Sequence, residues 1–140
     1  MPPTSGKTFL DTNVVVYLYS SDEPDKKAAA LAVIEKERPV VSTQVLSELA
    51  NTLSRKFALP LNVVTRAVEE VRDACTVVTI MPDTILRALA LAQHYRYAYY
   101  DSLILAAALS TNCDTLATED MQHGQLIERT LTIRNPFGKA

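Results

Sequence analysis

Residues 8–13 read Thr8-Phe9-Leu10-Asp11-Thr12-Asn13, and this short unit sets a pattern that the rest of the chain repeats. Its apolar residues predict a buried strand over 8–10. Asp11-Thr12-Asn13 can then cap a helix that runs to Leu18, because short polar oxygens satisfy the free backbone N–H groups of a first helical turn. The unit therefore places a carboxylate, Asp11, where a strand ends and a helix begins.

Strand and helix patterns alternate along the remaining sequence. We expect strands at 40–42, 76–80, 114–118 and 131–133. We expect helices at 24–38, 43–57, 59–73, 82–94 and 101–109, the last apolar on all sides and therefore buried. Since short links join these segments, the sequence predicts an α/β fold with a central, mainly parallel sheet of four to five strands flanked by helices.

The length and composition fit one domain. With 140 residues and 48% hydrophobic content, we expect a single domain over 1–140, a core over about 8–135, and frayed ends over 1–6 and 138–140. Cys75 and Cys113 lack metal-ligand spacing and are predicted to be reduced, buried thiols. No apolar run approaches the ~20 residues that span a bilayer, and no cleavable signal precedes the first strand, so we expect a cytoplasmic protein.

The charge balance leaves nucleic-acid binding open. A formal net charge of −2 argues against a broad basic face, yet two bound divalent ions would give −2 + 4 = +2. With only three glycines, the chain has neither a GxGxxG nor a GxxxxGK[ST] motif. Dinucleotide and ATP-driven chemistry are therefore disfavoured.

Four acidic residues follow apolar segments at positions that one sheet edge can gather: Asp11, Glu48, Asp101 and Asp120. Each alone has an ordinary explanation, as a helix cap for Asp11 and Asp101, as a solvated helix flank for Glu48, or as a turn for Asp120. As a set they are costly, because two carboxylates about 5 Å apart repel by roughly 3 kcal/mol at an effective dielectric of ~20. Such a cluster favours a hard divalent cation and metal-activated water.

Four motifs then resemble a known family. They are Leu-Asp-Thr-Asn at 10–13, Ser47-Glu48, Tyr-Tyr-Asp-Ser-Leu-Ile at 99–104 and Thr-Glu-Asp-Met-Gln-His-Gly at 118–124. Together, over about 8–135, they resemble the PIN domain, and most closely the VapC-type toxins of bacterial toxin–antitoxin pairs. The resemblance implies a PIN-like three-layer fold.

The resemblance also implies an activity, a ribonuclease that hydrolyses RNA with one or two Mg²⁺ or Mn²⁺ ions and leaves 3′-hydroxyl and 5′-phosphate ends. Asp11, Glu48, Asp101 and Asp120 would be the metal-binding, catalytic acids, with Asn13 and Thr118 in support. Glu119 adjoins Asp120 and competes with it for the fourth position. A cognate antitoxin protein and a homodimer are the implied partners.

Residues that contact substrate are harder to assign. Arg55, Lys56 and Arg96 lie near the acids in sequence and are candidates for holding phosphates. His94 and His123 are weaker candidates for acid–base chemistry. Tyr97, Tyr99 and Tyr100 could stack on unpaired bases, but their spacing beside a buried helix favours core packing.

Two further expectations concern partners and rival functions. Val14, Val15, Tyr17 and Leu18, with residues near Leu46 and Leu53, are either core or a groove for a partner helix. A phosphate-accepting receiver domain is disfavoured, because the strands at 40–42 and 76–80 end without an acid and no lysine lies between 57 and 138. A PIN-like module that binds RNA or protein without catalysis remains the alternative.

Overall fold

The computed structural model describes residues 5–138 and is built around one six-stranded sheet. The strands are β1 (Lys7–Leu10), β2 (Arg38–Ser42), β3 (Thr76–Val78), β4 (Thr115–Ala117), β5 (Leu126–Ile127) and β6 (Leu131–Arg134). Their order across the sheet is β3-β2-β1-β4-β6-β5, and neighbours are parallel except for the antiparallel pair β5 and β6. The predicted α/β class with a mainly parallel sheet is confirmed.

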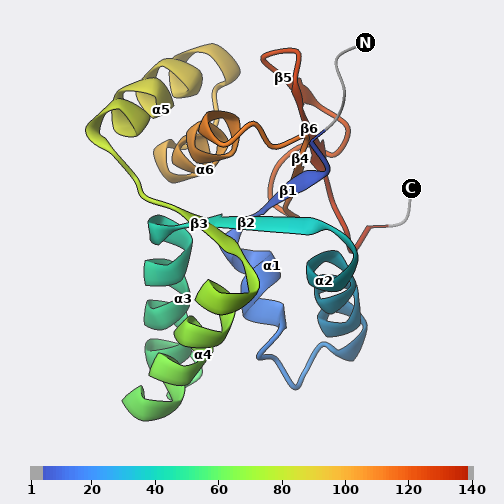
Figure 1. Ribbon diagram of the computed structural model, residues 1–140, viewed down its shortest axis with the longest axis vertical. Coiled ribbons are helices and arrows are strands. Elements are labelled where there is room, and N and C mark those ends of the chain that lie inside the picture. Colours follow the sequence, from blue (N-terminus) through green and yellow to red (C-terminus); the bar gives the residue numbers. More distant parts are fainter. Residues whose placement is uncertain (1–4, 139–140) are drawn as a thin grey trace.

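Helices cover both faces of this sheet. They are α1 (Thr12–Tyr17), α2 (Pro24–Lys36), α3 (Thr43–Arg55), α4 (Leu61–Ala74), α5 (Pro82–Tyr95) and α6 (Tyr99–Ser110). In Figure 1, α1 to α4 lie below the sheet, and α5 and α6 lie above it. The result is the predicted three-layer arrangement. No helix in the described part of the chain combines the length and apolarity needed to cross a membrane.

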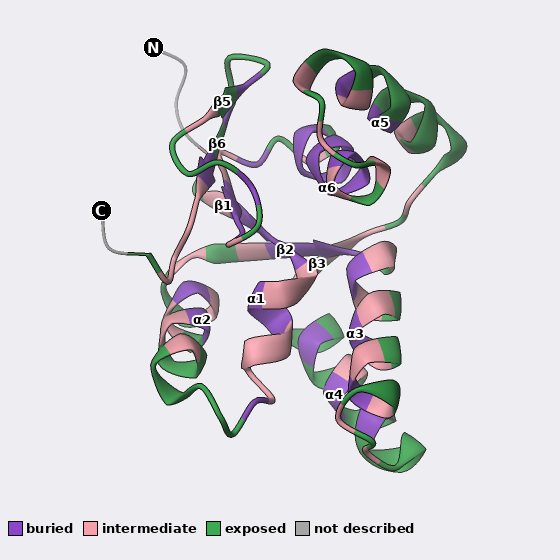
Figure 2. Ribbon diagram, turned by 180° about the vertical axis from the view of Figure 1, so that it is seen from behind, coloured by how far each residue is buried: buried purple, intermediate pink, exposed green. Residues whose placement is uncertain are grey.

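Helix α6 is the most buried helix. Every residue from Ser102 to Leu109 is buried, as its uninterrupted apolar sequence predicts. Figure 2 shows α6 buried over most of its length, though not in its first turn, and α5 exposed on its outer side. The predicted role of Asp101 as the cap of this helix is wrong: Ala98 is the N-cap, its carbonyl accepts the Ser102 N–H at 2.9 Å, and Asp101 is the third helical residue.

Strand pairing aligns the ends of β1 and β4. Leu10 pairs with Ala117, and the Asp11 N–H donates to the Ala117 carbonyl at 3.0 Å. Phe9 and Leu116, which pair within the same ladder, are fully buried and anchor both strands in the core. The residues that follow the two strands therefore leave the sheet side by side at its carboxyl edge.

The sequence missed β5, which has two residues and is defined by its pairing with β6 rather than by any local pattern. The predicted fraying also needs correction at Ser5 and Gly6, because their backbone N–H groups donate to the Asp114 carboxylate at 3.0 and 2.6 Å. Gly138 is likewise tied back, to Asn135 Oδ1 at 3.1 Å. The fraying predicted for 1–4 and 139–140 lies outside the described residues.

Both cysteines are free thiols. Cys113 is buried as expected, whereas Cys75 is only partly buried.

Candidate active site

A cleft of about 590 Å³ opens at the carboxyl edge of the sheet and contains all four predicted acids. We call it the acid cleft; its walls carry Asp11, Glu48, Asp101, Asp120, Thr12, Asn13, Gln44, Ser47, Asn51, Thr52, Tyr100 and Ile104. The acids come from four separate segments: the β1–α1 junction, the middle of α3, the first turn of α6 and the loop after β4. The fold thus gathers residues that lie up to 109 positions apart in the sequence.

Asp11 is the most buried of the four acids, with 6% of its surface exposed. It is the N-cap of α1 and accepts hydrogen bonds from the Thr12 N–H and from the Thr118 hydroxyl, both at 2.7 Å. Burial raises the pKa of Asp11 to about 6; the two hydrogen bonds lower it in part, and the charges of Asp101 and Asp120 raise it further. Its charge is therefore poorly compensated.

Asp101 is partly buried, and every cause that acts on it raises its pKa. The largest is burial, followed by the charges of Asp120 and Glu48. Asp101 is thus close enough to Asp11, Asp120 and Glu48 for their charges to repel its own.

Helix α1 orients the two remaining acids through its first turn. The Thr12 hydroxyl donates to Glu48 Oε1 at 2.6 Å, and Asn13 Nδ2 donates to Asp120 Oδ2 at 2.7 Å. The fully buried Thr118 hydroxyl, besides donating to Asp11, accepts the Asp120 N–H at 3.2 Å. The predicted supporting residues Asn13 and Thr118 therefore lie where they can orient the acids.

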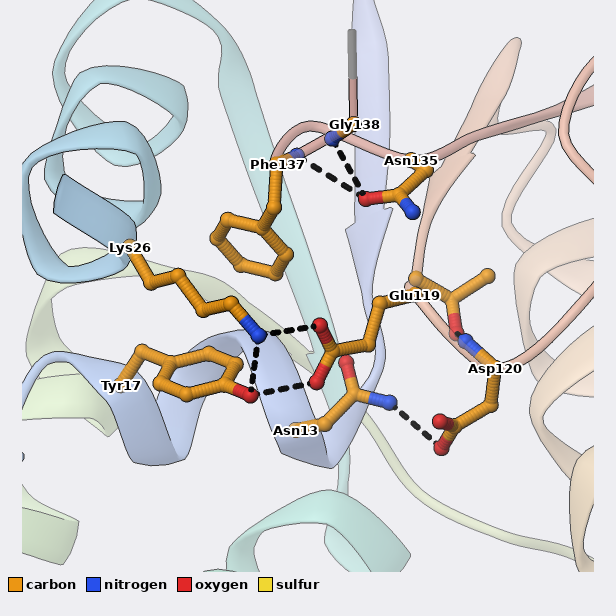
Figure 3. A network of polar contacts seen from close by, with 9 residues as sticks. Asn13, Tyr17, Lys26, Glu119, Asp120, Asn135, Phe137 and Gly138 are labelled. Carbon is orange, nitrogen blue, oxygen red and sulfur yellow. Dashed lines mark hydrogen bonds and ion pairs between the residues drawn. The ribbon is translucent and has the colours of Figure 1, made fainter. Parts of the chain in front are cut away.

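Glu119 and Asp120 are neighbours in sequence but face different surroundings (Figure 3). Glu119 lies outside the acid cleft, where it accepts a hydrogen bond from the Tyr17 hydroxyl and forms an ion pair with Lys26 at 3.0 Å. The Lys26 ammonium also lies 4.8 Å from the centre of the Tyr17 ring, and Phe137 packs edge-on against that ring at 5.0 Å. The structure places Asp120 in the acid cleft and commits Glu119 to this separate network.

The donor chemistry of the acid cleft fits a hard cation, since carboxylate and amide oxygens are the preferred protein ligands of Mg²⁺ and Mn²⁺. Among residues 5–138, two buried side-chain oxygens lack a hydrogen-bond partner, Asn13 Oδ1 and Gln44 Oε1, and both residues line this cleft. Within the same residues, however, no three His, Cys, Asp or Glu side chains are already arranged around a metal position. An ion shared by three of the acids requires their side chains to turn toward it.

Comparison with known proteins gives this cleft a family context. The sequence model of the PIN domain family matches residues 8–126. The chain belongs to the PIN domain family. A search of curated protein sequences found no match.

Solved structures of similar fold come from toxin–antitoxin systems. A toxin–antitoxin complex from Klebsiella pneumoniae superposes with a TM-score of 0.69 at 21% identity, over 92% of this chain and 97% of the other. VapC20 of Mycobacterium tuberculosis, described as a toxin that cleaves the sarcin-ricin loop, gives a TM-score of 0.65 at 18% identity, over 81% and 89%. FitAcB from Neisseria gonorrhoeae gives 0.65 at 21%, over 92% and 97%. At these identities the likeness shows the fold alone.

Of the predicted phosphate-binding residues of this PIN domain, Lys56 lies beside the acid cleft, in a hollow that Asp22, Glu23 and Glu119 also line. This hollow of about 490 Å³ adjoins the acid cleft, since both include Thr12, Asn13 and Thr52. Arg55 and Arg96 are exposed and do not line the acid cleft. Their contact with substrate stays a prediction.

Both histidines also lie away from the acid cleft. His94 packs edge-on against Tyr95 at 4.5 Å, and His123 Nδ1 accepts the Asn135 N–H at 2.9 Å.

The sequence missed several residues that line the acid cleft. Gln44, Ser47 and Asn51 share a flank of α3 with Glu48, and helical spacing from Glu48 was the signal that could have found them. For Tyr100 the predicted core packing is wrong: it is 64% exposed and lines the cleft. Tyr97 and Tyr99 do pack against the core.

Of the two alternatives for the early apolar residues, core or a groove for a partner helix, core is confirmed for Val14, Val15 and Leu53, which are fully buried. An apolar groove of about 250 Å³ does exist nearby, between the end of α1, α2 and α4. We call it the α2–α4 groove; its lining includes Leu18, Tyr19, Leu31, Ile34, Val71 and Ala74.

Proposed function

We propose that this PIN domain is a divalent-metal-dependent endoribonuclease and the toxin of a toxin–antitoxin pair. The observation that carries the proposal is the meeting of Asp11, Glu48, Asp101 and Asp120 in one cleft, from four separate segments. The raised pKa values of Asp11 and Asp101 support it, because crowded carboxylates bind a cation more readily than carboxylates that are already paired.

The four acids would hold one or two Mg²⁺ or Mn²⁺ ions, which supply a Lewis acid and lower the pKa of bound water. The chain itself contributes orientation. Thr12 and Asn13 each hold one carboxylate oxygen, of Glu48 and Asp120, and leave the second oxygen free to face the cleft. On Asp11 both carboxylate oxygens are held, one by the Thr12 N–H and the other by the fully buried Thr118 hydroxyl.

Substrate phosphates need positive charge beside the acids. Lys56 is the best placed candidate, because its hollow continues from the acid cleft past Thr12 and Asn13. Arg55 and Arg96 would contact parts of the RNA farther from the cleft. Since the proposed substrate is RNA, we place the activity in the cytoplasm.

Two apolar surfaces suit the proposed partners. The α2–α4 groove suits an apolar segment of a cognate antitoxin, in line with the toxin–antitoxin complexes among the structural neighbours. Helix α5 exposes Ile85, Leu86 and Leu89, the last two at 64% and 47%, and offers a surface for a second copy of the chain.

Cleavage of a structured RNA tests the enzymatic proposal. We expect cleavage with Mg²⁺ or Mn²⁺, none with EDTA, and a rate at least about 100-fold lower for Asp11→Asn. Asp73→Asn is the matched control: its carboxylate is 68% exposed on α4, and this variant should cut like the wild type. Cleavage that persists in EDTA, or that Asp11→Asn leaves unchanged, would remove the mechanism.

The alternative is a PIN domain that binds RNA or protein without cutting. The observation in its favour is that, within residues 5–138, three acids do not already surround a metal position. RNA that stays intact at every metal concentration, while the protein still binds it, would favour this alternative.

A further inference from the structure

Tyr100 is an exposed aromatic residue at the edge of the acid cleft. Its surface is 64% exposed, and it immediately precedes Asp101 in the first turn of α6. Tyr99 contacts it edge-on, with ring centres 5.2 Å apart and planes at 66°, which supports the ring of Tyr100 from one side. An aromatic ring exposed to this degree beside a polar cleft is available to a flat ligand.

Gln44, on α3, lines the same cleft and is held against the backbone of Tyr100. Gln44 Nε2 donates to the Tyr100 carbonyl oxygen at 3.3 Å. Because a carbonyl can only accept, this contact places the NH₂ group of Gln44 next to Tyr100 and leaves Oε1 without a donor.

Gln44 Oε1 is buried, and within residues 5–138 it has no hydrogen-bond partner. Buried acceptors in folded proteins are nearly always satisfied, so this oxygen would gain a hydrogen bond if the Gln44 side chain turned it into the cleft toward a donor on a ligand.

We infer that Tyr100 and Gln44 form a binding site for an unpaired nucleobase that carries an exocyclic amino group. The inference rests on the proposed ribonuclease function and names a determinant of its substrate preference. Tyr100 stacks on the base, and Gln44 Oε1 accepts a hydrogen bond from the amino group. Adenine, cytosine and guanine have such a group, and uracil does not.

The site also selects for unpaired RNA. In a duplex, neighbouring bases cover both faces of each base, and the exocyclic amino groups take part in pairing. The face and the donor that Tyr100 and Gln44 require are free only in a single strand or a loop. Cleavage would then fall next to an unpaired adenosine, cytidine or guanosine.

Binding of a fluorescent oligoribonucleotide tests the role of Tyr100 without relying on cleavage. The probe is a uridine octamer with one central 2-aminopurine, whose fluorescence is quenched by stacking, titrated with Ca²⁺ in place of Mg²⁺ and checked on a gel for intact RNA. We expect saturable quenching by the wild type and by Tyr100→Phe, and at least fivefold weaker binding with little quenching by Tyr100→Ala. Leu61→Ala removes an apolar side chain that is 73% exposed on α4, and should bind like the wild type.

A second pair of probes tests Gln44, namely uridine octamers labelled at one end and carrying at the centre either adenosine or purine riboside, which stacks like adenosine but lacks the exocyclic amino group. The wild type should prefer the adenosine probe by about fivefold, the value of one hydrogen bond, and Gln44→Met should bind both probes alike. Thermal melting confirms that each variant is folded.

The inference is overturned if the wild type fails to quench the 2-aminopurine probe, if Tyr100→Ala quenches it as the wild type does, or if Gln44→Met keeps the preference for adenosine. Cleavage with Mg²⁺ is measured separately on the same RNAs. Tyr100-dependent quenching without any cleavage would support the base site and refute the nuclease. Cleavage without Tyr100-dependent quenching would support the nuclease and refute the base site.

Discussion

The two ends of the parallel sheet hold aspartates in opposite electrostatic surroundings. At the carboxyl end, burial raises the pKa of Asp11 to about 6, and the charges of Asp101 and Asp120 add to the shift. Two hydrogen bonds to Asp11 offset this only in part. Asp11 and Asp101, the two acids with raised pKa values at this end, therefore have too few partners to stabilise their charge fully.

At the amino end, Asp114 precedes β4 and accepts the backbone N–H groups of Ser5 and Gly6 at 3.0 and 2.6 Å. Burial acts to raise the pKa of Asp114 as well, but these hydrogen bonds outweigh it, and the net pKa is lowered. Position at a strand end is therefore not what makes an acid a candidate ligand. What matters is whether the surrounding groups already stabilise its charge.

Glu119 and Asp120 are adjacent in sequence, but only Asp120 lines the acid cleft. Asp120→Asn should reduce RNA cleavage by about 100-fold, because it removes a carboxylate of the acid cleft. Glu119→Gln should change cleavage by less than about threefold, since Glu119 is committed to Tyr17 and Lys26 outside the cleft. Initial rates on one RNA at saturating Mn²⁺ measure both, and equal losses would show that the two acids share one role.

Asp11→Asn should also stabilise the metal-free protein in a pH-dependent way. A folded-state pKa of about 6 against 3.8 means that the folded protein holds this proton more tightly than the unfolded chain. Wild-type stability should therefore fall as pH rises from about 4 to about 6, by up to about 3 kcal/mol. Asparagine cannot titrate, so the stability of the variant relative to the wild type should rise by about that much between pH 4 and pH 7.

Urea unfolding in EDTA, at several pH values, measures the difference in the free energy of unfolding between Asp11→Asn and the wild type. At pH 7 the net gain should be nearer about 2 kcal/mol, because asparagine loses one of the two hydrogen bonds that Asp11 accepts. The stability of the control variant Asp73→Asn should change with pH as that of the wild type does. If the difference between Asp11→Asn and the wild type does not change with pH, burying the charged form of Asp11 does not destabilise the fold.

Asp114→Asn should have the opposite and smaller effect. One of its two backbone donors would face an amide NH₂ instead of an oxygen, and the loss should be about 1 kcal/mol at pH 7. The lowered pKa means that this stabilisation is present above the unfolded-state pKa and is lost as pH falls through the folded one. An Asp114→Asn variant as stable as the wild type would remove the contrast between the two ends of the sheet.

Local sequence was sufficient for the main architecture. Apolar strands that end in polar caps predicted β1 and the cap at Asp11, because both depend on neighbouring residues only. The rule that parallel strands present their carboxyl ends at one edge was enough to expect Asp11 and Asp120 in one place, where the acid cleft now has them.

The remaining features depend on distant contacts. Two-residue β5 exists through its pairing with β6, and nothing in the local sequence separates Glu119 from Asp120. That separation comes from Tyr17 and Lys26, more than 90 residues earlier in the chain.

The exposure of Tyr100 was missed for a related reason. Helix α6 begins at Tyr99 rather than at the expected Asp101, and this earlier start places Tyr100 on the first helical turn, where it is exposed. The position of a helix start is set by one or two backbone hydrogen bonds, and a sequence pattern resolves it poorly.

Calorimetric titration of Mn²⁺ into the metal-free protein tests most directly whether the crowded end of the sheet is a cation site. We expect the wild type and Asp114→Asn to bind alike, and Asp11→Asn and Asp101→Asn each to bind at least about tenfold more weakly. Binding that Asp11→Asn and Asp101→Asn leave at wild-type strength, or no Mn²⁺ binding by the wild type, would contradict the account.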